Sequence, residues 1–387
     1  MSTHRRHSWV ALLGVFVGGG VLVTLLAFFW PDRVYTSGAH SFRVETFATG
    51  LDTPWGMVFL PDGRMLVTER RGNLRIVEAD GTVSEPIGGV PEVCRCGQGG
   101  LMDVQLHPNY EENGWLYLAY SDRKDGGGSS GFTAVMRARL DGMQLVDQED
   151  IYKAPQEVYS GRGQHYGSRI VFDEAGYLYF TIGDRGRRQQ AQQLDLPNGK
   201  VHRLHDDGRI PDDNPFVGTP GAVASIWSYG HRNPQGMDRH PETGALWAAE
   251  HGPRGGDELN HVRKGLNYGW PVITYGINYS GTKITDLTEK EGMEQPALHW
   301  TPSIAVCGIA FYDGHVFPDW QNNLFVTSLK FSKIQRVVLD GTTVASEEML
   351  FKSGGRPRDI VTGPDGYLYI AIEGSPGRIV RLVPEDV

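Results

Sequence analysis

The stretch Gly363-Pro-Asp-Gly-Tyr-Leu-Tyr-Ile370 joins turn-forming residues to a short run of alternating β-prone residues. Turn residues followed by such a run are typical of a β-hairpin. A similar phrase occurs at five earlier places in the chain. These copies lie at residues 60–67, 107–118, 172–180, 240–247 and 317–326.

Six copies at intervals of about 45–75 residues predict a repeat architecture. A single up-and-down barrel would not repeat so regularly, whereas blades around a central channel would. We therefore expect an all-β chain that forms a six-bladed β-propeller. The longer intervals are insertions, and loops of this kind gather at one face and carry the functional site.

The N-terminus predicts a separate segment, residues 1–31, ahead of a propeller domain at residues 32–387. His4-Arg5-Arg6-His7 precedes an uncharged run from Trp9 to Trp30, and about 20 such residues can cross a bilayer as one helix. Basic residues before the helix favour a cytoplasmic N-terminus, with the domain on the extracytoplasmic, periplasmic side of the inner membrane. The alternative is a cleaved signal peptide, which has a shorter apolar region and a small-residue cleavage site.

The formal net charge of −9 argues against a nucleic-acid partner, because phosphate binding needs a basic face. The three cysteines, Cys94, Cys96 and Cys307, are too few for a disulfide framework. In an exported domain, a bridge between Cys307 and either Cys94 or Cys96 is one possibility, with the odd thiol left free. A chain without that bridge is the other.

His165 is the first candidate site residue. It lies in Gly161-Arg-Gly-Gln-His-Tyr-Gly-Ser-Arg169, among glycines that favour a loop at a blade entrance. Imidazole is the side chain best able to accept a proton near neutral pH. The alternative is an ordinary histidine on a surface loop.

A dispersed set of polar and cationic residues forms the second candidate. Ser228-Tyr-Gly-His-Arg-Asn-Pro-Gln-Gly236 places Arg232 beside Asn233, and further cations are Lys330, Arg356 and Arg358. Residues from different blades meet at a central channel, and such donors suit an anionic, oxygen-rich ligand. Solvated charges with salt-bridge partners are the alternative explanation.

The third candidate is a metal-binding loop over residues 250–260, continued by residues 265–271. Ca²⁺ accepts backbone carbonyls as well as carboxylates; Gly252 and Pro253 offer carbonyls, and Glu258 offers a carboxylate. The spacing is not that of an EF-hand, and Asp257-Glu258 could equally be an exposed acidic pair.

The chain resembles the pyrroloquinoline-quinone (PQQ)-dependent soluble aldose dehydrogenases and glucose/sorbosone dehydrogenases from about Phe47 to Leu382. The resemblance depends on many short motifs in the same order. They are Leu51-Asp-Thr-Pro-Trp-Gly56, Gly97-Gln-Gly-Gly-Leu101, His165 with Gly167-Ser-Arg169, Thr181-Ile-Gly-Asp-Arg-Gly186, Gly208-Arg-Ile-Pro-Asp-Asp-Asn-Pro-Phe216, Gly230-His-Arg-Asn-Pro-Gln-Gly236, Gly252-Pro253 with Asp257-Glu-Leu-Asn260, and Arg356-x-Arg358-Asp359.

The resemblance implies a six-bladed propeller that oxidises aldose sugars at the anomeric C1 hydroxyl to lactones. It implies that His165 is the general base and that Arg232 and Asn233 contact the quinone oxygens of PQQ. The resemblance also implies the remaining cofactor contacts. They are Lys330, Arg356 and Arg358 at the carboxylates, with Gln98 and Tyr279 completing the pocket.

The same resemblance implies that Ca²⁺ lies on the cofactor, held by the carbonyls of Gly252 and Pro253. Glu258 and the Tyr268 carbonyl are similar to a further calcium position in bacterial relatives. The cation would polarise the quinone as a Lewis acid. An N-terminal anchor would place the enzyme beside a membrane quinone or cytochrome that accepts its electrons.

Two features depart from the family pattern: Cys94-Arg-Cys96 directly before Gln98, and Cys307 within Ser303-Ile-Ala-Val-Cys-Gly308. Both segments are expected near the mouth of the pocket. Two other functions compete with the dehydrogenase: a metal-dependent lactonase or esterase, and a non-catalytic extracytoplasmic binding propeller. A lactonase needs acidic metal ligands in the channel, and a binding protein would be free to lose His165.

Overall fold

The computed structural model describes residues 33–385, which form six antiparallel sheets. In chain order, the first sheet contains β3 (Pro54–Phe59), β4 (Met65–Glu69) and β5 (Asn73–Val77); the second β6 (Leu101–Leu106), β7 (Trp115–Arg123), β8 (Gly131–Asp141) and β9 (Gln144–Tyr152); the third β10 (Ile170–Phe172), β11 (Leu178–Ile182), β12 (Lys200–Leu204) and β13 (Ile226–Tyr229). The fourth contains β14 (Pro234–Arg239), β15 (Leu246–Glu250), β16 (Asp257–Val262) and β17 (Leu298–Trp300); the fifth β18 (Val306–Phe311), β19 (Leu324–Ser328), β20 (Lys333–Asp340) and β21 (Thr343–Lys352); the sixth β22 (Arg356–Thr362), β23 (Leu368–Glu373), β24 (Gly377–Pro384), β2 (His40–Leu51) and β1 (Tyr35–Ser37). The described helices are α1 (Tyr110–Asn113) and three 3₁₀ turns, Gln156–Val158, Arg188–Gln192 and Pro318–Trp320.

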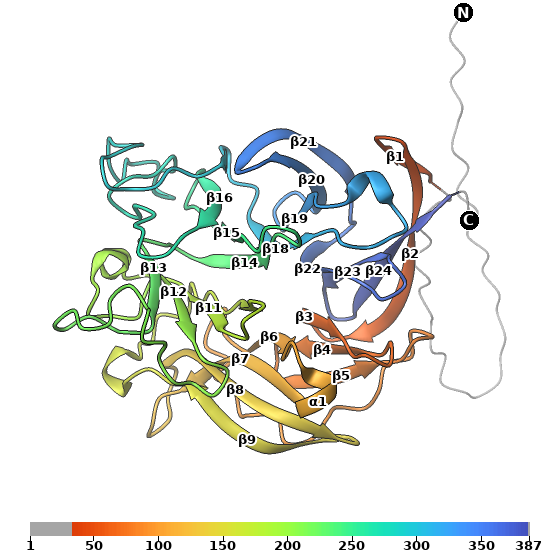
Figure 1. Ribbon diagram of the computed structural model, residues 1–387, viewed down its shortest axis with the longest axis horizontal. Helices are drawn as coiled ribbons and strands as arrows, with labels where there is room; N and C mark the ends of the chain where they lie inside the picture. The colour runs from red at the N-terminus through yellow and green to blue at the C-terminus, as the bar shows by residue number, and fades with distance from the viewer. Residues whose placement is uncertain (1–32, 386–387) are drawn as a thin grey trace, which may run out of the picture. The chain divides into compact units, whose positions relative to one another are not determined.

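The six sheets are the blades of a propeller, so the predicted fold is confirmed (Figure 1). The first strands of successive blades, β3, β6, β10, β14, β18 and β22, contact one another in turn, and β22 returns to β3. The ring closes within the sixth blade, where β2 from the start of the domain pairs with β24 from its end. A sheet ring closed in this way holds its two chain ends together by backbone hydrogen bonds.

Each copy of the repeated sequence pattern forms the same element of a blade. All six copies span the turn between the innermost strand of a blade and its second strand, as between β22 and β23. The turns therefore lie at one end of the channel. The innermost strands begin, and the second strands end, at the opposite end. Loops at that opposite end can combine side chains from every blade.

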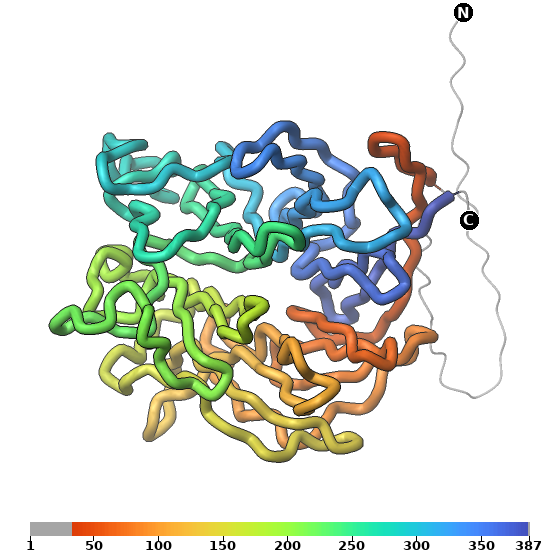
Figure 2. The backbone as a smooth tube through the Cα atoms, in the orientation of Figure 1, coloured from red at the N-terminus to blue at the C-terminus, as the bar shows by residue number. Residues whose placement is uncertain are grey.

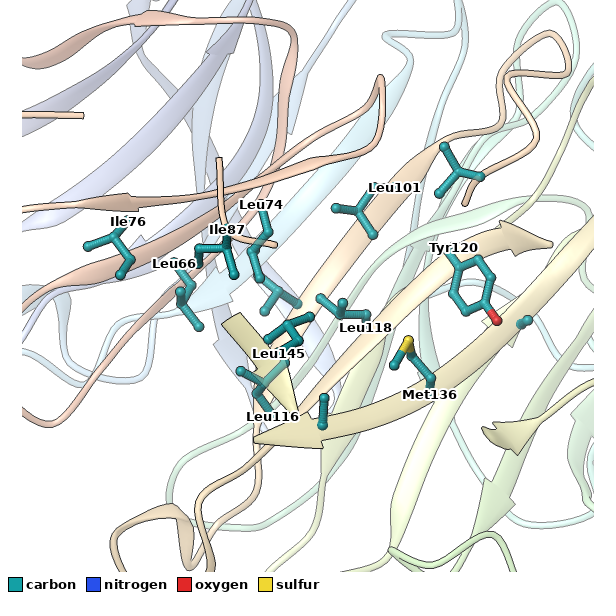
Figure 3. Close-up of a cluster of buried hydrophobic side chains, with 14 of the residues drawn as sticks. Leu66, Leu74, Ile76, Ile87, Leu101, Leu116, Leu118, Tyr120, Met136 and Leu145 are labelled. Carbon is teal, nitrogen blue, oxygen red and sulfur yellow. The ribbon is translucent and has the colours of Figure 1, made fainter. Parts of the chain in front are cut away.

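Apolar side chains fill the space between neighbouring blades. Figure 3 shows this packing between the first two blades, where Leu66 and Leu74 meet Leu116 and Leu118. These four side chains have no exposed surface. Truncating a residue of this kind to alanine costs roughly 2–5 kcal/mol, so the inter-blade core fixes the positions from which the loops project.

One arginine joins the innermost strands near the propeller axis. Arg169, directly before β10, is buried, and its guanidinium contacts four other innermost strands. Its partners are Asp103 Oδ1 on β6 at 3.1 Å, the Gln235 carbonyl on β14 at 2.6 Å, Asp359 Oδ1 and the Arg358 carbonyl on β22 at 2.9 and 3.0 Å, and the Trp55 ring on β3, whose centroid is 4.3 Å from Cζ. Burial is the main cause that raises the pKa of Asp359, to about 7, although the Arg169 charge opposes it. This cluster lies in the channel beneath the loops at the end where the innermost strands begin.

The longest strand-free connection in residues 33–385 is the segment 263–297 between β16 and β17 (teal in Figure 2). Bridges tie it to neighbouring loops, Asn267 to Tyr229 and Ile277 to Arg254. Among the described residues, no helix is long and apolar enough to cross a membrane. The anchor predicted at residues 1–31 lies outside them.

Candidate active site

A polar cavity of about 220 Å³ opens at the end of the channel where the innermost strands begin. It is surrounded by residues from loops and strand ends of several blades. The lining consists of Trp55, Arg70, Gln98, His165, Arg232, Asn233, Gln235, His251, Tyr279, Leu329, Arg356, Arg358 and Glu373. The channel therefore brings together residues that are up to about three hundred positions apart in the sequence.

A second cavity of about 280 Å³ adjoins the first and shares four of its lining residues, Gln98, His165, Arg232 and Tyr279. The other residues around it come from the third and fourth blades. They are Gln164, Asp184, Gly186, Arg188, Pro253, Trp270 and Asn278. His165 lies at the boundary of the two cavities, so a molecule in either one can reach it.

His165 occupies a loop that several hydrogen bonds hold in place. Its φ of 57° is in the left-handed region, which is uncommon for a residue other than glycine. Gln98 Oε1 accepts its backbone N–H at 2.8 Å. Behind it, the buried Arg185 donates to the carbonyls of Arg162 and Gln164. Such backbone strain persists where the surroundings impose it, which is frequent at functional sites.

The imidazole of His165 is fixed by a carboxylate. Its Nδ1 donates to Asp184 Oδ1 at 2.6 Å, and Asp184 also accepts from Trp270 Nε1 on its other oxygen at 2.8 Å. Burial lowers the pKa of His165, and the Arg232 charge lowers it further against the Asp184 hydrogen bond. A neutral ring that donates from Nδ1 leaves Nε2 as a proton acceptor. The pair is therefore built as a general base and its positioning residue.

Asp184 itself is kept ionised. Burial acts to raise its pKa, but the hydrogen bonds from His165 and Trp270 and the charge of Arg232 together hold the pKa below its ordinary value. An ionised carboxylate at this position fixes the tautomer of the histidine and stabilises the ring when it gains a proton.

Arg232 is a buried cation without a carboxylate partner in residues 33–385. Its Nη1 donates to the His251 carbonyl at 2.8 Å, while its buried Nε has no hydrogen-bond partner in the described structure. Its backbone N–H is bound by Glu250 Oε2 at 2.6 Å. A buried, incompletely paired guanidinium costs free energy unless a ligand completes its contacts. Arg232 therefore favours an anionic or strongly polar ligand.

Asn233 follows Arg232 and lines the same cavity. Its Oδ1 accepts the Gly167 N–H at 3.1 Å, and its carbonyl accepts the His251 N–H at 3.1 Å. Because Oδ1 is bound on the protein side, the orientation of the amide is set and its NH₂ group is the part available to a ligand.

Arg356 and Arg358 share one carboxylate at the far side of the first cavity. Glu373 Oε2 lies 3.2 Å from Arg356 Nε and 2.5 Å from Arg358 Nη2. Burial acts to raise the pKa of Glu373, but the two arginines hold it below its ordinary value. The buried Nε of Arg358 has no hydrogen-bond partner in residues 33–385, and both arginines line the first cavity.

Of the two alternatives for Cys307, the structure shows the chain without a bridge to Cys94 or Cys96. Cys94 and Cys96 bond each other across a Cα–Cα distance of 5.1 Å. Cys307 is a buried free thiol on β18, 3.6 Å from Arg358 Nη1 and 3.7 Å from Gln235 Oε1. The disulfide lies in the loop before Gln98, whereas Cys307 lies on an innermost strand of another blade, so the fold separates them.

The predicted metal loop lies between β15 and β16. Pro253 lines the second cavity, and the carbonyl oxygens of Gly252 and Pro253 accept no hydrogen bond from residues 33–385. Glu258 on β16 is bound by Asn260 Nδ2 at 3.2 Å. Burial and the neighbouring Glu250 raise the pKa of Glu258 well above its ordinary value. No group of three or more acidic, histidine or cysteine side chains in the described part forms a metal cluster.

The remaining candidates divide into two groups. Gln98 and Tyr279 line both cavities, and Tyr279 is 74% exposed, which gives it freedom to close on a ligand. Lys330 is exposed, with Nζ 5.1 Å from the centroid of the Phe331 ring, and its neighbour Leu329 lines the cavity instead. Tyr268 stacks on His231 at a centroid distance of 4.6 Å and lines neither cavity.

The structure adds residues that had no assigned role in the sequence analysis. Asp184 stands in the quoted motif Thr181-Ile-Gly-Asp-Arg-Gly186, where an acid directly after a strand was the available signal. Glu373 and Arg356 lie at matched distances on either side of the turn at residues 363–366, and strand pairing places them opposite each other. Gln235 and His251 lie in the two candidate segments 228–236 and 250–260, but neither was assigned a role from the sequence.

The fold and site define a class: a six-bladed propeller whose channel end carries an arginine-rich cavity beside a carboxylate-bound histidine. The chain belongs to the glucose/sorbosone dehydrogenase family, whose model matches residues 51–381. This membership places it among the oxidoreductases that act on sugars.

Individual relatives agree with the family. The aldose sugar dehydrogenase YliI of Escherichia coli (strain K12) is 45% identical over 350 residues, which cover 89% of this chain and 93% of that protein. The soluble aldose sugar dehydrogenase of Escherichia coli, solved in its apo form, matches with a TM-score of 0.85 at 44% identity, over 89% of this chain and 100% of that one. The PQQ-bound aldose sugar dehydrogenase of Streptomyces coelicolor matches with a TM-score of 0.72 at 27% identity, over 89% and 98%.

Proposed function

We propose that the protein is a PQQ-dependent aldose dehydrogenase that oxidises the C1 hydroxyl of the sugar to a lactone. The observation that carries this proposal is the cavity in which buried Arg232 and Arg358 each keep an unpaired Nε beside the His165–Asp184 pair. A similar protein from Streptomyces coelicolor has been solved with PQQ bound. A proton acceptor and an unsatisfied anion-binding cavity are what oxidation of an alcohol by an anionic quinone requires.

The residues around the first cavity fit a quinone that carries carboxylates. Arg232 and the Asn233 amide would bind the quinone oxygens, where negative charge develops during the reaction. Three cations would bind the carboxylates: Arg356, Arg358 and, from the rim, Lys330. Gln98 and Tyr279 would close the pocket over the bound group.

Bound PQQ would supply the acceptor for the hydride that leaves C1. The chain supplies the other half of the step. His165 Nε2 takes the proton of the C1 hydroxyl as the C=O bond forms, and Asp184 stabilises the resulting imidazolium. Arg232 lowers the pKa of His165, which keeps the ring neutral and ready to accept the proton.

Calcium would lie against the cofactor, bound by the free carbonyls of Gly252 and Pro253 and by oxygens of the cofactor itself. Ca²⁺ prefers such hard oxygen ligands, and a cation there polarises the quinone. Glu258 and the Tyr268 carbonyl would form a further calcium position.

The remaining proposals concern cellular context. Residues 1–31 would anchor the protein to the inner membrane, with residues 32–387 as the dehydrogenase domain on the extracytoplasmic side. Electrons would pass from the reduced cofactor to a membrane quinone or a cytochrome. The motivation is the uncharged run from Trp9 to Trp30 after a basic start.

A reconstitution assay tests the proposed function. The purified cofactor-free protein should oxidise aldoses with an artificial electron acceptor only after both PQQ and Ca²⁺ are added. Calcium removal by a chelator should abolish activity, and readdition should restore it. Undiminished activity in chelator would overturn the calcium assignment, and activity with a nicotinamide cofactor alone would overturn the assignment of PQQ.

A further inference from the structure

The second cavity points to the class of sugar that the enzyme prefers, an inference that rests on the proposed function. We propose that this cavity is built for aldoses with an anionic group at the end remote from C1, such as hexuronic acids. Arg188 is the residue that would bind the anionic group.

The guanidinium of Arg188 is exposed, and it is oriented by a neighbouring amide. Its Nη1 and Nη2 both donate to Asn278 Oδ1, at 3.1 and 3.2 Å, and its Cζ lies 5.7 Å from the centroid of the Trp270 ring. Asn278 is itself bound, donating to Thr282 Oγ1 at 3.0 Å and to the Lys283 carbonyl at 3.1 Å. A cation oriented before binding loses less conformational entropy when a ligand arrives.

The backbone beneath Arg188 is also fixed. The buried Lys200 donates from Nζ to the carbonyls of Gln190, Ala191 and Asn198, at 3.0, 2.9 and 2.6 Å. These three carbonyls belong to the 3₁₀ turn that begins with Arg188 and to the loop after it. The position of the charge is therefore part of the fold.

Arg188 has no ion-pair partner among residues 33–385. Many other surface arginines in that part of the chain do have one, for example Arg64 with Asp62 at 2.7 Å and Arg209 with Asp207 at 2.6 Å. The chain as a whole is acidic, so an unpaired, oriented arginine at the cavity is not a consequence of excess positive charge.

The cavity has one lining carboxylate, and it is already used. Asp184 Oδ1 binds His165 and the Gly186 N–H, and Oδ2 binds Trp270. Of the two arginines that line the cavity, Arg232 is assigned to the cofactor. Arg188 is therefore the cation left to bind an anionic group of the sugar through a charge-assisted hydrogen bond.

The orientation follows from the reaction. C1 must lie at His165, where its hydroxyl proton is removed, and Arg188 lines the same cavity, so we place the remote end of the sugar ring at Arg188. The reaction at C1 is unchanged by the substituent. Arg188 therefore acts on substrate binding and leaves the chemical step alone.

Steady-state kinetics of the PQQ-loaded enzyme test this inference. We expect KM for glucuronate to be roughly 5- to 30-fold below that for glucose, the usual range for a charge-assisted hydrogen bond at a partly exposed site. Arg188→Gln should raise KM for glucuronate to about the value for glucose, and the change in KM for glucose should be much smaller. Added salt should raise KM for glucuronate alone. Arg209→Gln removes one charge from the ion pair with Asp207 and is the matched control. It should change KM for neither substrate.

Calorimetry supplies a readout that does not depend on turnover. Methyl β-D-glucuronide, whose blocked C1 prevents oxidation, should bind more tightly than methyl β-D-glucoside, and Arg188→Gln should remove the difference. Equal affinity of the parental protein for both glycosides, or a preference that survives Arg188→Gln, overturns the inference. A change in PQQ affinity in Arg188→Gln, with sugar affinities unchanged, would assign the arginine to the cofactor and overturns it as well. If neither sugar is oxidised but the glycoside preference is present, the proposed function fails and the anion site stands.

Discussion

His165→Gln should lower turnover by about 10²–10⁴-fold, the usual contribution of a positioned general base. Glutamine keeps a polar side chain of similar reach but cannot accept a proton from the sugar. PQQ binding should be unaffected, because buried arginines supply most of that free energy. Stopped-flow absorbance of the bound cofactor, under saturating PQQ and sugar, measures the reductive step directly.

Arg358→Ala is the contrasting variant. It removes a charge-assisted hydrogen bond worth about 1.5–3 kcal/mol, so PQQ affinity should fall while the reductive step of fully loaded enzyme changes little. A thermal melt of each variant separates these effects from unfolding. If His165→Gln reduces its cofactor at the parental rate, the histidine is structural and the proposed mechanism is wrong.

The pH profile of the parental enzyme also tests whether His165 is the general base. Burial lowers the pKa of His165, so the ring stays neutral below the ordinary histidine value of about 6.5. On the acid side, kcat/KM for a neutral aldose should therefore decrease with a midpoint that lies below pH 6.5. A limb well above that value would assign the titration to another group.

Arg169→Met should destabilise the domain by about 3–5 kcal/mol, because removing one partner of a buried ion cluster leaves Asp103 and Asp359 without compensation. The substitution also removes the hydrogen bonds that Arg169 donates to the carbonyls of Gln235 and Arg358. Urea unfolding followed by fluorescence gives the free energy of unfolding. The loss should diminish at low pH, where the two carboxyl groups are protonated.

Arg139→Met is the matched control for Arg169→Met. Arg139 also combines an aromatic contact, 3.8 Å from the Trp115 centroid, with an ion pair to Asp147 at 2.8 Å. Its side chain is 40% exposed, so its ion pair is screened and its loss should cost about 1 kcal/mol or less. Equal losses in the two variants would show that the axial cluster contributes nothing beyond an ordinary surface contact.

The blade count could be predicted from sequence because each blade carries its own local turn phrase. The hairpin between β22 and β23 is encoded in eight consecutive residues, and the pairing of Thr362 with Leu368 confirms it. The disulfide could not be predicted in this way. Cys94 and Cys96 are neighbours in sequence, but whether either reaches Cys307 depends on the distance between two blades.

The site was predictable only in part, because local sequence patterns do not show which residues of different blades meet. Loops rich in glycine marked His165 and Arg232, and the propeller brings both to one cavity. The role of Glu373 depends on strand register, and the role of Arg169 depends on all innermost strands meeting at the axis. Lys330 is exposed and does not line the cavity, whereas its neighbour Leu329 does, and the sequence alone could not distinguish the two.

The most direct test of the central claim is a single turnover under anaerobic conditions. Protein loaded with one equivalent of PQQ, in the presence of Ca²⁺, is mixed with excess glucose, and lactone and reduced cofactor are quantified. The proposed function predicts one lactone for each PQQ reduced, with a slower step for glucose deuterated at C1 and no product in protein without PQQ. Lactone formed without PQQ, or bound PQQ that stays oxidised in the presence of each aldose tested, would contradict it.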